Sequence, residues 1–89
     1  MQIHAIEQLG NGVTVAYTDM GAIYTANGRQ FEVAGEYDSG EAWLDGWHYC
    51  YAREESTVEL TDADTGELVH VFEDTDAGWA DFALTQLSK

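Results

Sequence analysis

Carboxylates are the residues of this chain best suited to do chemistry, and they are distributed unevenly along it. The 89 residues include 17 Asp and Glu against three Lys and Arg, which gives a formal net charge of −14 at pH 7. The first 35 residues hold three of the acids and one base, Arg29. Residues 36–81 hold the other fourteen acids and one base, Arg53. Charge of one sign over such a stretch governs the salt response and the choice of partner more than the fold.

One acidic segment has the opening of a calcium-binding loop. Asp62-Ala63-Asp64-Thr65-Gly66-Glu67 begins like an EF-hand loop, and Glu73 falls at its twelfth position. The EF-hand needs glycine at its sixth position, where this chain has Glu67, and it needs flanking helices where these flanks are typical of strands. We therefore interpret the segment as a polar hairpin tip.

His48 and Cys50 form the second candidate for a metal-binding or nucleophilic pair. A single His-x-Cys pair supplies two of the four ligands that a structural zinc site needs. The pair is also a weak candidate for a Cys–His nucleophile, because acidic surroundings disfavour the thiolate that such a nucleophile requires. The chain has no G-x-S-x-G, Walker A or G-x-G-x-x-G pattern. We expect a protein that is not an enzyme and that holds no metal and no cofactor.

The first half of the chain is typical of short strands separated by glycine-containing turns. Residues 2–8 are compatible with a strand, and residues 13–18 alternate with the period of two of a half-buried strand. A strand over 22–25 leads to Asn27-Gly28, a strong hairpin signal because both central residues of a type I′ turn need positive φ. A further strand is expected over 30–37.

The middle of the chain combines helical and strand signals. Five apolar residues fall at helical spacing, namely Trp43, Leu44, Trp47, Cys50 and Tyr51. Asp38 with Glu41 has the spacing of a helix capping arrangement, whereas the aromatic run at 47–51 favours a strand. We predict a brief helical turn near residues 40–45, followed by a strand near 47–54.

The last third predicts a hairpin followed by a helix. Strands over 57–61 and 67–73 flank the loop at 62–66, and Thr75 or Asp76 is the expected cap of the helix. The apolar residues of this helix form one stripe that can lie on a sheet: Trp79, Ala80, Ala83, Leu84 and Leu87. The predicted fold is α+β, a mostly antiparallel sheet built from hairpins with one C-terminal helix packed on it, in a single domain over residues 1–89.

Composition also indicates a soluble cytoplasmic protein. Cys50 is the single cysteine, so no internal disulfide can form. The first residues lack the basic and apolar regions of a signal peptide, and no segment approaches the ~20 apolar residues needed to span a bilayer. The negative charge disfavours direct binding to nucleic acid, because phosphate contacts need Lys and Arg.

The acidic stretch has a spacing suited to imitating phosphates. Alternate residues on one face of a strand lie ~6.6–6.8 Å apart, on the scale of neighbouring phosphates along a backbone. B-DNA carries one charge per ~1.7 Å of helix axis. Carboxylates on strands, hairpin tips and a helix start can therefore present a ladder of charge to a protein groove built for DNA or RNA.

In size and charge the chain resembles the small acidic inhibitors encoded by phages, which include anti-CRISPR proteins, anti-restriction proteins and the uracil-DNA glycosylase inhibitor. The resemblance rests on overall character and on the acidic stretch Glu36–Asp81. It implies a non-enzymatic inhibitor that occupies the basic groove of a CRISPR effector or of a restriction or repair enzyme. The expected phosphate mimics are Glu36, Asp38, Glu41, Asp45, Glu54, Glu55, Asp62, Asp64 and Glu67, with Trp43 and Trp47 as apolar anchors.

The alternative interpretation is an acidic interaction domain of a halophilic organism. An excess of Asp and Glu would then serve solubility in a salt-loaded cytoplasm and would imply no mimicry. That adaptation should act along the whole surface, whereas the first 35 residues of this chain are almost neutral. The two interpretations differ in whether the carboxylates gather on one part of the folded domain.

Overall fold

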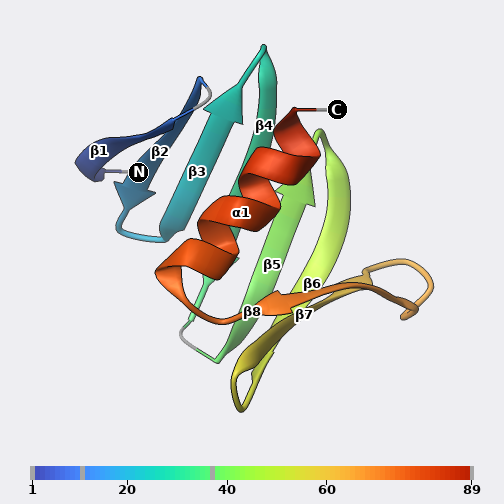
Figure 1. Cartoon of the computed structure of the whole chain (residues 1–89). Helices are drawn as coiled ribbons and strands as arrows, with labels where there is room; N and C mark the ends of the chain where they lie inside the picture. The colour runs from blue at the N-terminus through green and yellow to red at the C-terminus, as the bar shows by residue number, and fades with distance from the viewer. Residues whose placement is uncertain (1, 11, 37, 89) are drawn as a thin grey trace.

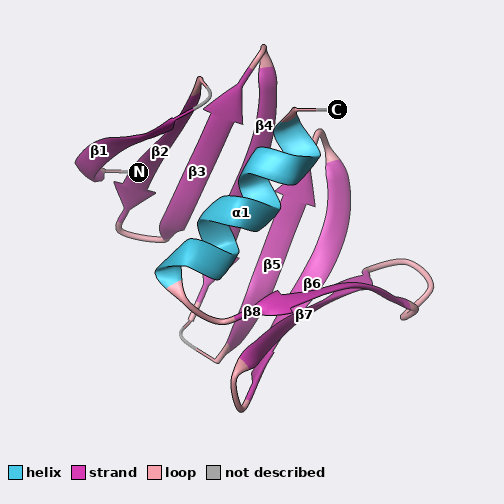
Figure 2. Cartoon of the chain, in the orientation of Figure 1, coloured by secondary structure: helices cyan, strands magenta, loops and turns pink. Residues whose placement is uncertain are grey.

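A single antiparallel sheet and one helix make up the fold of the computed structural model, which describes residues 2–10, 12–36 and 38–88. Eight strands follow one another across the sheet in sequence order. Their bounds are β1 (Ile3–Gly10), β2 (Val13–Thr18), β3 (Gly21–Ala26), β4 (Arg29–Gly35), β5 (Ser39–Leu44), β6 (Trp47–Glu54), β7 (Thr57–Asp62) and β8 (Leu68–Glu73). The helix α1 (Asp76–Leu87) lies diagonally across one face of the sheet (Figures 1 and 2).

The α+β fold predicted from the sequence is confirmed. The strand predicted over 13–18 coincides with β2, and the predicted hairpin at the end of the chain corresponds to β7 and β8. Asn27 and Gly28 have φ of 55° and 73°, as a type I′ turn between β3 and β4 requires. The end of the strand predicted over 30–37 includes residue 37, which lies outside the described residues.

The helical turn predicted near residues 40–45 is wrong, because this segment is strand β5. Asp45 and Gly46 have φ of 50° and 85° and form a two-residue turn, across which Leu44 pairs with Trp47 of β6. Asp-Gly at such a turn is a type I′ signal. Pairing with β4 on one side and β6 on the other overrides the helical spacing of the apolar residues, and no helix begins at Asp38.

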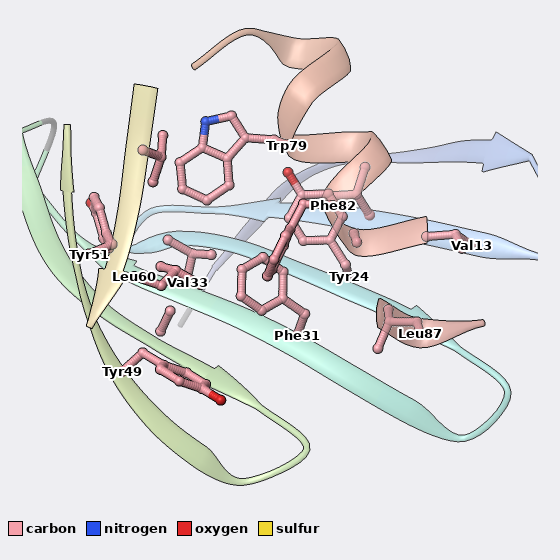
Figure 3. Close-up of a cluster of buried hydrophobic side chains, with 14 of the residues drawn as sticks. Val13, Tyr24, Phe31, Val33, Tyr49, Tyr51, Leu60, Trp79, Phe82 and Leu87 are labelled. Carbon is pink, nitrogen blue, oxygen red and sulfur yellow. The ribbon is translucent and has the colours of Figure 1, made fainter. Parts of the chain in front are cut away.

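The hydrophobic core lies between α1 and the face of the sheet that the helix covers. Figure 3 shows Trp79 and Phe82 directed from the helix towards side chains of the strands. Aromatic rings form a continuous series of contacts from β3 through the helix to β6. The distances between ring centroids are 5.6 Å for Tyr24–Phe31, 5.2 Å for Phe31–Phe82, 4.4 Å for Phe72–Phe82, 4.9 Å for Phe72–Trp79 and 6.0 Å for Tyr51–Trp79. Each such pair adds roughly 0.5–1.5 kcal/mol beyond its buried area.

Specific contacts at its two ends fix the position of α1. Thr75 is the N-cap, and its Oγ1 accepts a hydrogen bond from the Gly78 backbone N at 2.9 Å. Gly78 packs so closely on β8 that an added Cβ would lie 1.9 Å from the Glu73 carbonyl oxygen. At the other end, Asn27 Nδ2 donates to the Leu87 carbonyl at 3.3 Å. The start of the helix is thereby held next to the end of β8.

The helix has 12 residues. Within the ranges that the structure describes, no helix combines the length and the apolar character needed to cross a membrane.

Candidate functional site

Every second turn of the sheet lies at the same end, because successive antiparallel strands run in opposite directions. The β2–β3, β4–β5 and β6–β7 turns and the segment between β8 and α1 share one end, along the lower left side of Figure 1. Backbone hydrogen bonds tie these segments to their neighbours: Gly35 N to Met20 O (3.0 Å), Arg53 N to Asp38 O (2.9 Å) and Asp74 N to Ser56 O (2.8 Å).

Eight of the 17 acidic residues lie at this end, and we call them the acidic rim: Asp19, Glu36, Asp38, Glu54, Glu55, Glu73, Asp74 and Asp76. All are exposed except Asp74, which is half-buried. Among the described residues the single Lys or Arg at this end is Arg53, so the side chains carry seven net negative charges. The charges do not form a straight row, because Asp74, which follows β8, lies in contact with Arg53 of β6.

The acidic rim borders a cleft of about 580 Å³ between the sheet and the first turn of α1. Its aromatic lining comes from four elements: Tyr17 of β2, Tyr24 of β3, Tyr51 of β6 and Trp79 of α1. Rim carboxylates line it as well, namely Glu36, Asp74 and Asp76. The site therefore combines aromatic walls with a negatively charged mouth.

Arg53 is a fixed part of this cleft. Its Nη1 lies 3.0 and 3.2 Å from the two carboxylate oxygens of Asp74. Its guanidinium carbon lies 5.5 Å from the centroid of the Trp79 ring, whose Nε1 donates to Asp74 Oδ1 at 3.1 Å. The Asp74 carboxylate and the Trp79 ring both hold the guanidinium in place, the first by a charge-assisted hydrogen bond and the second by a cation–π contact.

The hydroxyls of Tyr17, Tyr24 and Tyr51, which line the cleft, are neutral at physiological pH. Burial raises the pKa of Tyr24 and that of Tyr51 above the ordinary value. Burial also raises the pKa of Tyr17, to which the negative charges of Glu7 and Asp76 add. A neutral phenol both donates and accepts hydrogen bonds, and the Tyr51 hydroxyl donates to the Glu36 carbonyl oxygen.

Four of the nine carboxylates predicted as phosphate mimics belong to the acidic rim: Glu36, Asp38, Glu54 and Glu55. Glu55 occupies the turn between β6 and β7 with φ of 50°. This left-handed conformation favours glycine or asparagine and is unfavourable for a longer side chain.

Four others lie at the opposite end of the sheet: Asp45, Asp62, Asp64 and Glu67. Two of these have structural partners. Asp45 Oδ2 lies 2.6 Å from Arg29 Nη2, and this contact together with the Gln30 backbone N–H holds the pKa of Asp45 below its ordinary value. The pKa of Asp62 is also lowered, because its carboxylate accepts hydrogen bonds from Trp47 Nε1 (2.9 Å) and from two backbone N–H groups of its loop.

Glu41 and the predicted anchor Trp43 lie on the sheet face opposite α1. Trp43 stacks on His48 with ring centroids 5.2 Å apart, and His48 Nε2 lies 3.6 Å from Glu41 Oε2. The second predicted anchor, Trp47, is 58% exposed at the far end of the sheet from the acidic rim. The structure therefore does not bring the two tryptophans together with the acidic rim.

Sequence reasoning missed half of the acidic rim and the cleft beside it. The missed rim members are Asp19, Glu73, Asp74 and Asp76, and the cleft depends on Tyr17, Tyr51, Arg53 and Trp79. The available signal was the sequence of turns: once Asp45-Gly46 is counted as a hairpin, alternation of strand direction assigns each turn to an end of the sheet.

Metal-binding side chains do not gather in the described residues, among which no group of three or more His, Cys, Asp and Glu is placed to hold an ion. At the segment that resembles a calcium loop, Asp62 Oδ1 accepts hydrogen bonds from the backbone N of Asp64 (2.8 Å) and of Thr65 (3.1 Å), which closes a hairpin loop.

None of the protein-family models, curated proteins or solved structures compared with this chain matches it.

Proposed function

We propose that this protein is a non-enzymatic inhibitor whose acidic rim occupies the basic nucleic-acid-binding groove of another protein. The observation that supports the proposal is the convergence of eight carboxylates on one end of the sheet. Their single basic neighbour in the described chain, Arg53, is already paired with Asp74. Seven net negative charges therefore remain at this end of the sheet for a partner.

The acidic rim would act by position and charge alone. A groove that binds DNA or RNA presents Lys and Arg at phosphate spacing, and carboxylates placed at those positions exclude the nucleic acid. Complementary charge of this kind speeds association and makes the affinity fall as salt rises. No bond is made or broken, so occupancy of the groove is sufficient for inhibition.

The turn at Glu55 also favours this proposal. A glutamate with φ of 50° costs about 1–2 kcal/mol relative to an unstrained position, and glycine would relieve that strain. Backbone strain of this kind is concentrated at functional sites. A charged side chain kept there, at the tip of the acidic end, suits a role in binding better than a role in folding.

We propose a CRISPR effector, or a restriction or repair enzyme, as the partner. The test is displacement of a fluorescently labelled oligonucleotide from a panel of such purified proteins. Fluorescence anisotropy measures the displacement at several salt concentrations. The proposal expects displacement from at least one of them, weakening steeply between 50 and 200 mM salt, where contacts to phosphates weaken strongly. Failure to displace nucleic acid from any member at low salt would count against it.

An acidic solubility domain of a halophile is the second candidate, and one observation favours it. Nine of the 17 acids lie outside the acidic rim, at the opposite end, on the uncovered sheet face, on β1 and on α1. A halophilic domain should unfold near physiological salt and displace no nucleic acid. Thermal unfolding at 150 mM sodium chloride therefore separates the two candidates, since the inhibitor should remain folded there.

A further inference from the structure

We propose that the cleft beside the acidic rim is a binding site for an arginine side chain of the basic partner. This inference rests on the proposed function, because it names one group of the partner that the acidic end would take up. It adds a defined pocket to a surface that otherwise acts through distributed charge.

The cleft has the size and the lining for such a group. Its volume of about 580 Å³ is within the range of roughly 300–1,000 Å³ that is typical of small-ligand sites. Aromatic side chains line it on several sides, with Tyr17 37% exposed at the surface and Trp79 9% exposed in the interior. The faces of such rings attract cations, most strongly when water is excluded.

The charge of the lining is complementary to a cation. Glu36 and Asp76 line the cleft and are exposed, and neither forms an ion pair within the described part of the chain. Asp74 differs, because Arg53 already neutralises it. The cleft thus retains two negative side chains beside its aromatic walls.

The start of α1 also contributes to this charge balance. The N-terminus of a helix carries roughly half a positive charge, which would oppose a cation. Asp76 in the first turn offsets this charge locally, and Glu36 adds a second carboxylate from the β4–β5 turn. The sum at the mouth of the cleft therefore remains negative.

Arg53 shows which cation this environment accommodates. Its guanidinium contacts both oxygens of Asp74 and lies over the Trp79 ring. A planar guanidinium can pair with a carboxylate and stack on an aromatic ring at the same time, whereas the ammonium of lysine is a compact, strongly hydrated charge. The same lining should therefore prefer a second guanidinium to an ammonium.

The three tryptophans allow a direct test, because each reports on a different surface. Trp79 lines the cleft, Trp47 lies at the opposite end and Trp43 lies on the uncovered face. The protein is titrated with N-acetyl-arginine amide while two-dimensional NMR records the indole N–H signals. The Trp79 signal should shift saturably, and the signals of the other two tryptophans should stay almost unchanged. The citrulline analogue, which has a similar shape and no charge, should cause no saturable shift, and the lysine analogue should bind at least about threefold more weakly. Equal responses to arginine and citrulline, or equal shifts of all three signals, would overturn the inference.

A matched pair of double variants separates this pocket from bulk charge. Glu36→Gln with Asp76→Asn removes two carboxylates from the cleft, and Glu67→Gln with Asp64→Asn removes two from the opposite end. The first pair should weaken arginine binding by about five- to tenfold, since each exposed charge contact contributes roughly 0.2–1 kcal/mol. The second should change it by less than about twofold, and equal weakening by both pairs would show that no pocket is involved.

The proposed function and the cleft can fail separately. If arginine does not bind and the protein still displaces nucleic acid, the cleft inference is wrong and the proposed function stands. If arginine binds at Trp79 and no nucleic acid is displaced, the cleft is supported and the proposed function is contradicted.

Discussion

The guanidinium of Arg53 is paired with the carboxylate of Asp74, with Nη1 3.0 and 3.2 Å from the two oxygens. Their side chains are 25% and 12% exposed, so the contact is largely shielded from water. It joins β6 to the segment that leads into α1, on the wall of the cleft. The pair neutralises one member of the acidic rim and leaves the other seven carboxylates available for a partner.

Replacing Asp74 should destabilise the fold more than replacing its counterpart at the other end. Asp74→Asn leaves the guanidinium in a half-buried site without its counter-charge, and it should reduce the free energy of unfolding by about 1–3 kcal/mol in urea titration. Asp45→Asn breaks the pair with Arg29, in which the side chain of Arg29 is 30% exposed and that of Asp45 is 36% exposed. Water screens that contact, so the loss should stay below about 1 kcal/mol. Equal losses would contradict the structural role of the Arg53–Asp74 pair.

The start of α1 should depend on the hydroxyl of Thr75. Thr75→Ala removes the acceptor for the Gly78 N–H and should lower the free energy of unfolding by about 1 kcal/mol. Thr75→Ser keeps the acceptor and should retain most of the stability. A serine variant as unstable as the alanine variant would show that the methyl group, rather than the cap, matters at this position.

Acid should remove the contribution of Asp62 to stability. Its hydrogen bonds from Trp47 Nε1 and from two loop N–H groups lower its folded-state pKa. Stability from such a group is fully present above the unfolded pKa of about 3.9 and is lost as the pH falls through the lower folded-state value. The difference in unfolding free energy between the parent and Asp62→Asn should therefore be constant from pH 7 to about pH 5 and shrink below pH 4. A difference that persists at pH 2 would contradict this assignment.

Salt should stabilise the protein by screening the acidic rim. Two charges about 10 Å apart repel by about 0.4 kcal/mol in water, and 0.5 M salt shortens the screening length well below the ~30 Å found at 0.01 M. Raising sodium chloride from 10 to 500 mM should therefore add about 1 kcal/mol, or roughly 4–8 °C in Tm for a domain of this size.

A rim-neutralised variant serves as the control for that salt effect. Glu36→Gln, Asp38→Asn, Glu54→Gln and Glu55→Gln together should raise Tm at low salt and reduce the response to salt. If this variant responded to salt as strongly as the parent, the repulsion would have to arise elsewhere on the surface.

Local signals in the sequence predicted most of the strands. The alternation of residues 13–18, the Asn27-Gly28 turn and the cap predicted at Thr75 or Asp76 are each set within a few residues, so their outcome depends little on the rest of the fold. The helical turn predicted near residues 40–45 is wrong because Trp43 and Leu44 have helical spacing with later apolar residues. There the strand depends on pairing with β4 and β6, which a local pattern does not contain.

The single misassigned strand also concealed the candidate site. In an up-and-down sheet each strand reverses the direction of the chain, so leaving out β5 moves every later turn to the other end. Glu54 and Glu55 would then no longer share an end with Asp38. Arg53 and Asp74 are 21 residues apart in the sequence, and they meet only because the β7–β8 hairpin brings the chain back to the end of the sheet where β6 ends. Composition alone does not reveal this contact.

The central claim, that the acidic rim competes with nucleic acid, is tested most directly by comparing two variants of equal charge. The rim-neutralised variant is set against Glu32→Gln, Glu41→Gln, Asp64→Asn and Glu67→Gln, which removes the same number and types of acids from the rest of the surface. Each is measured for displacement of a labelled oligonucleotide from the same basic protein at 100 mM salt. We predict that the rim-neutralised variant loses at least about tenfold in potency while the control loses less than about threefold. Equal losses in the two variants would contradict the claim.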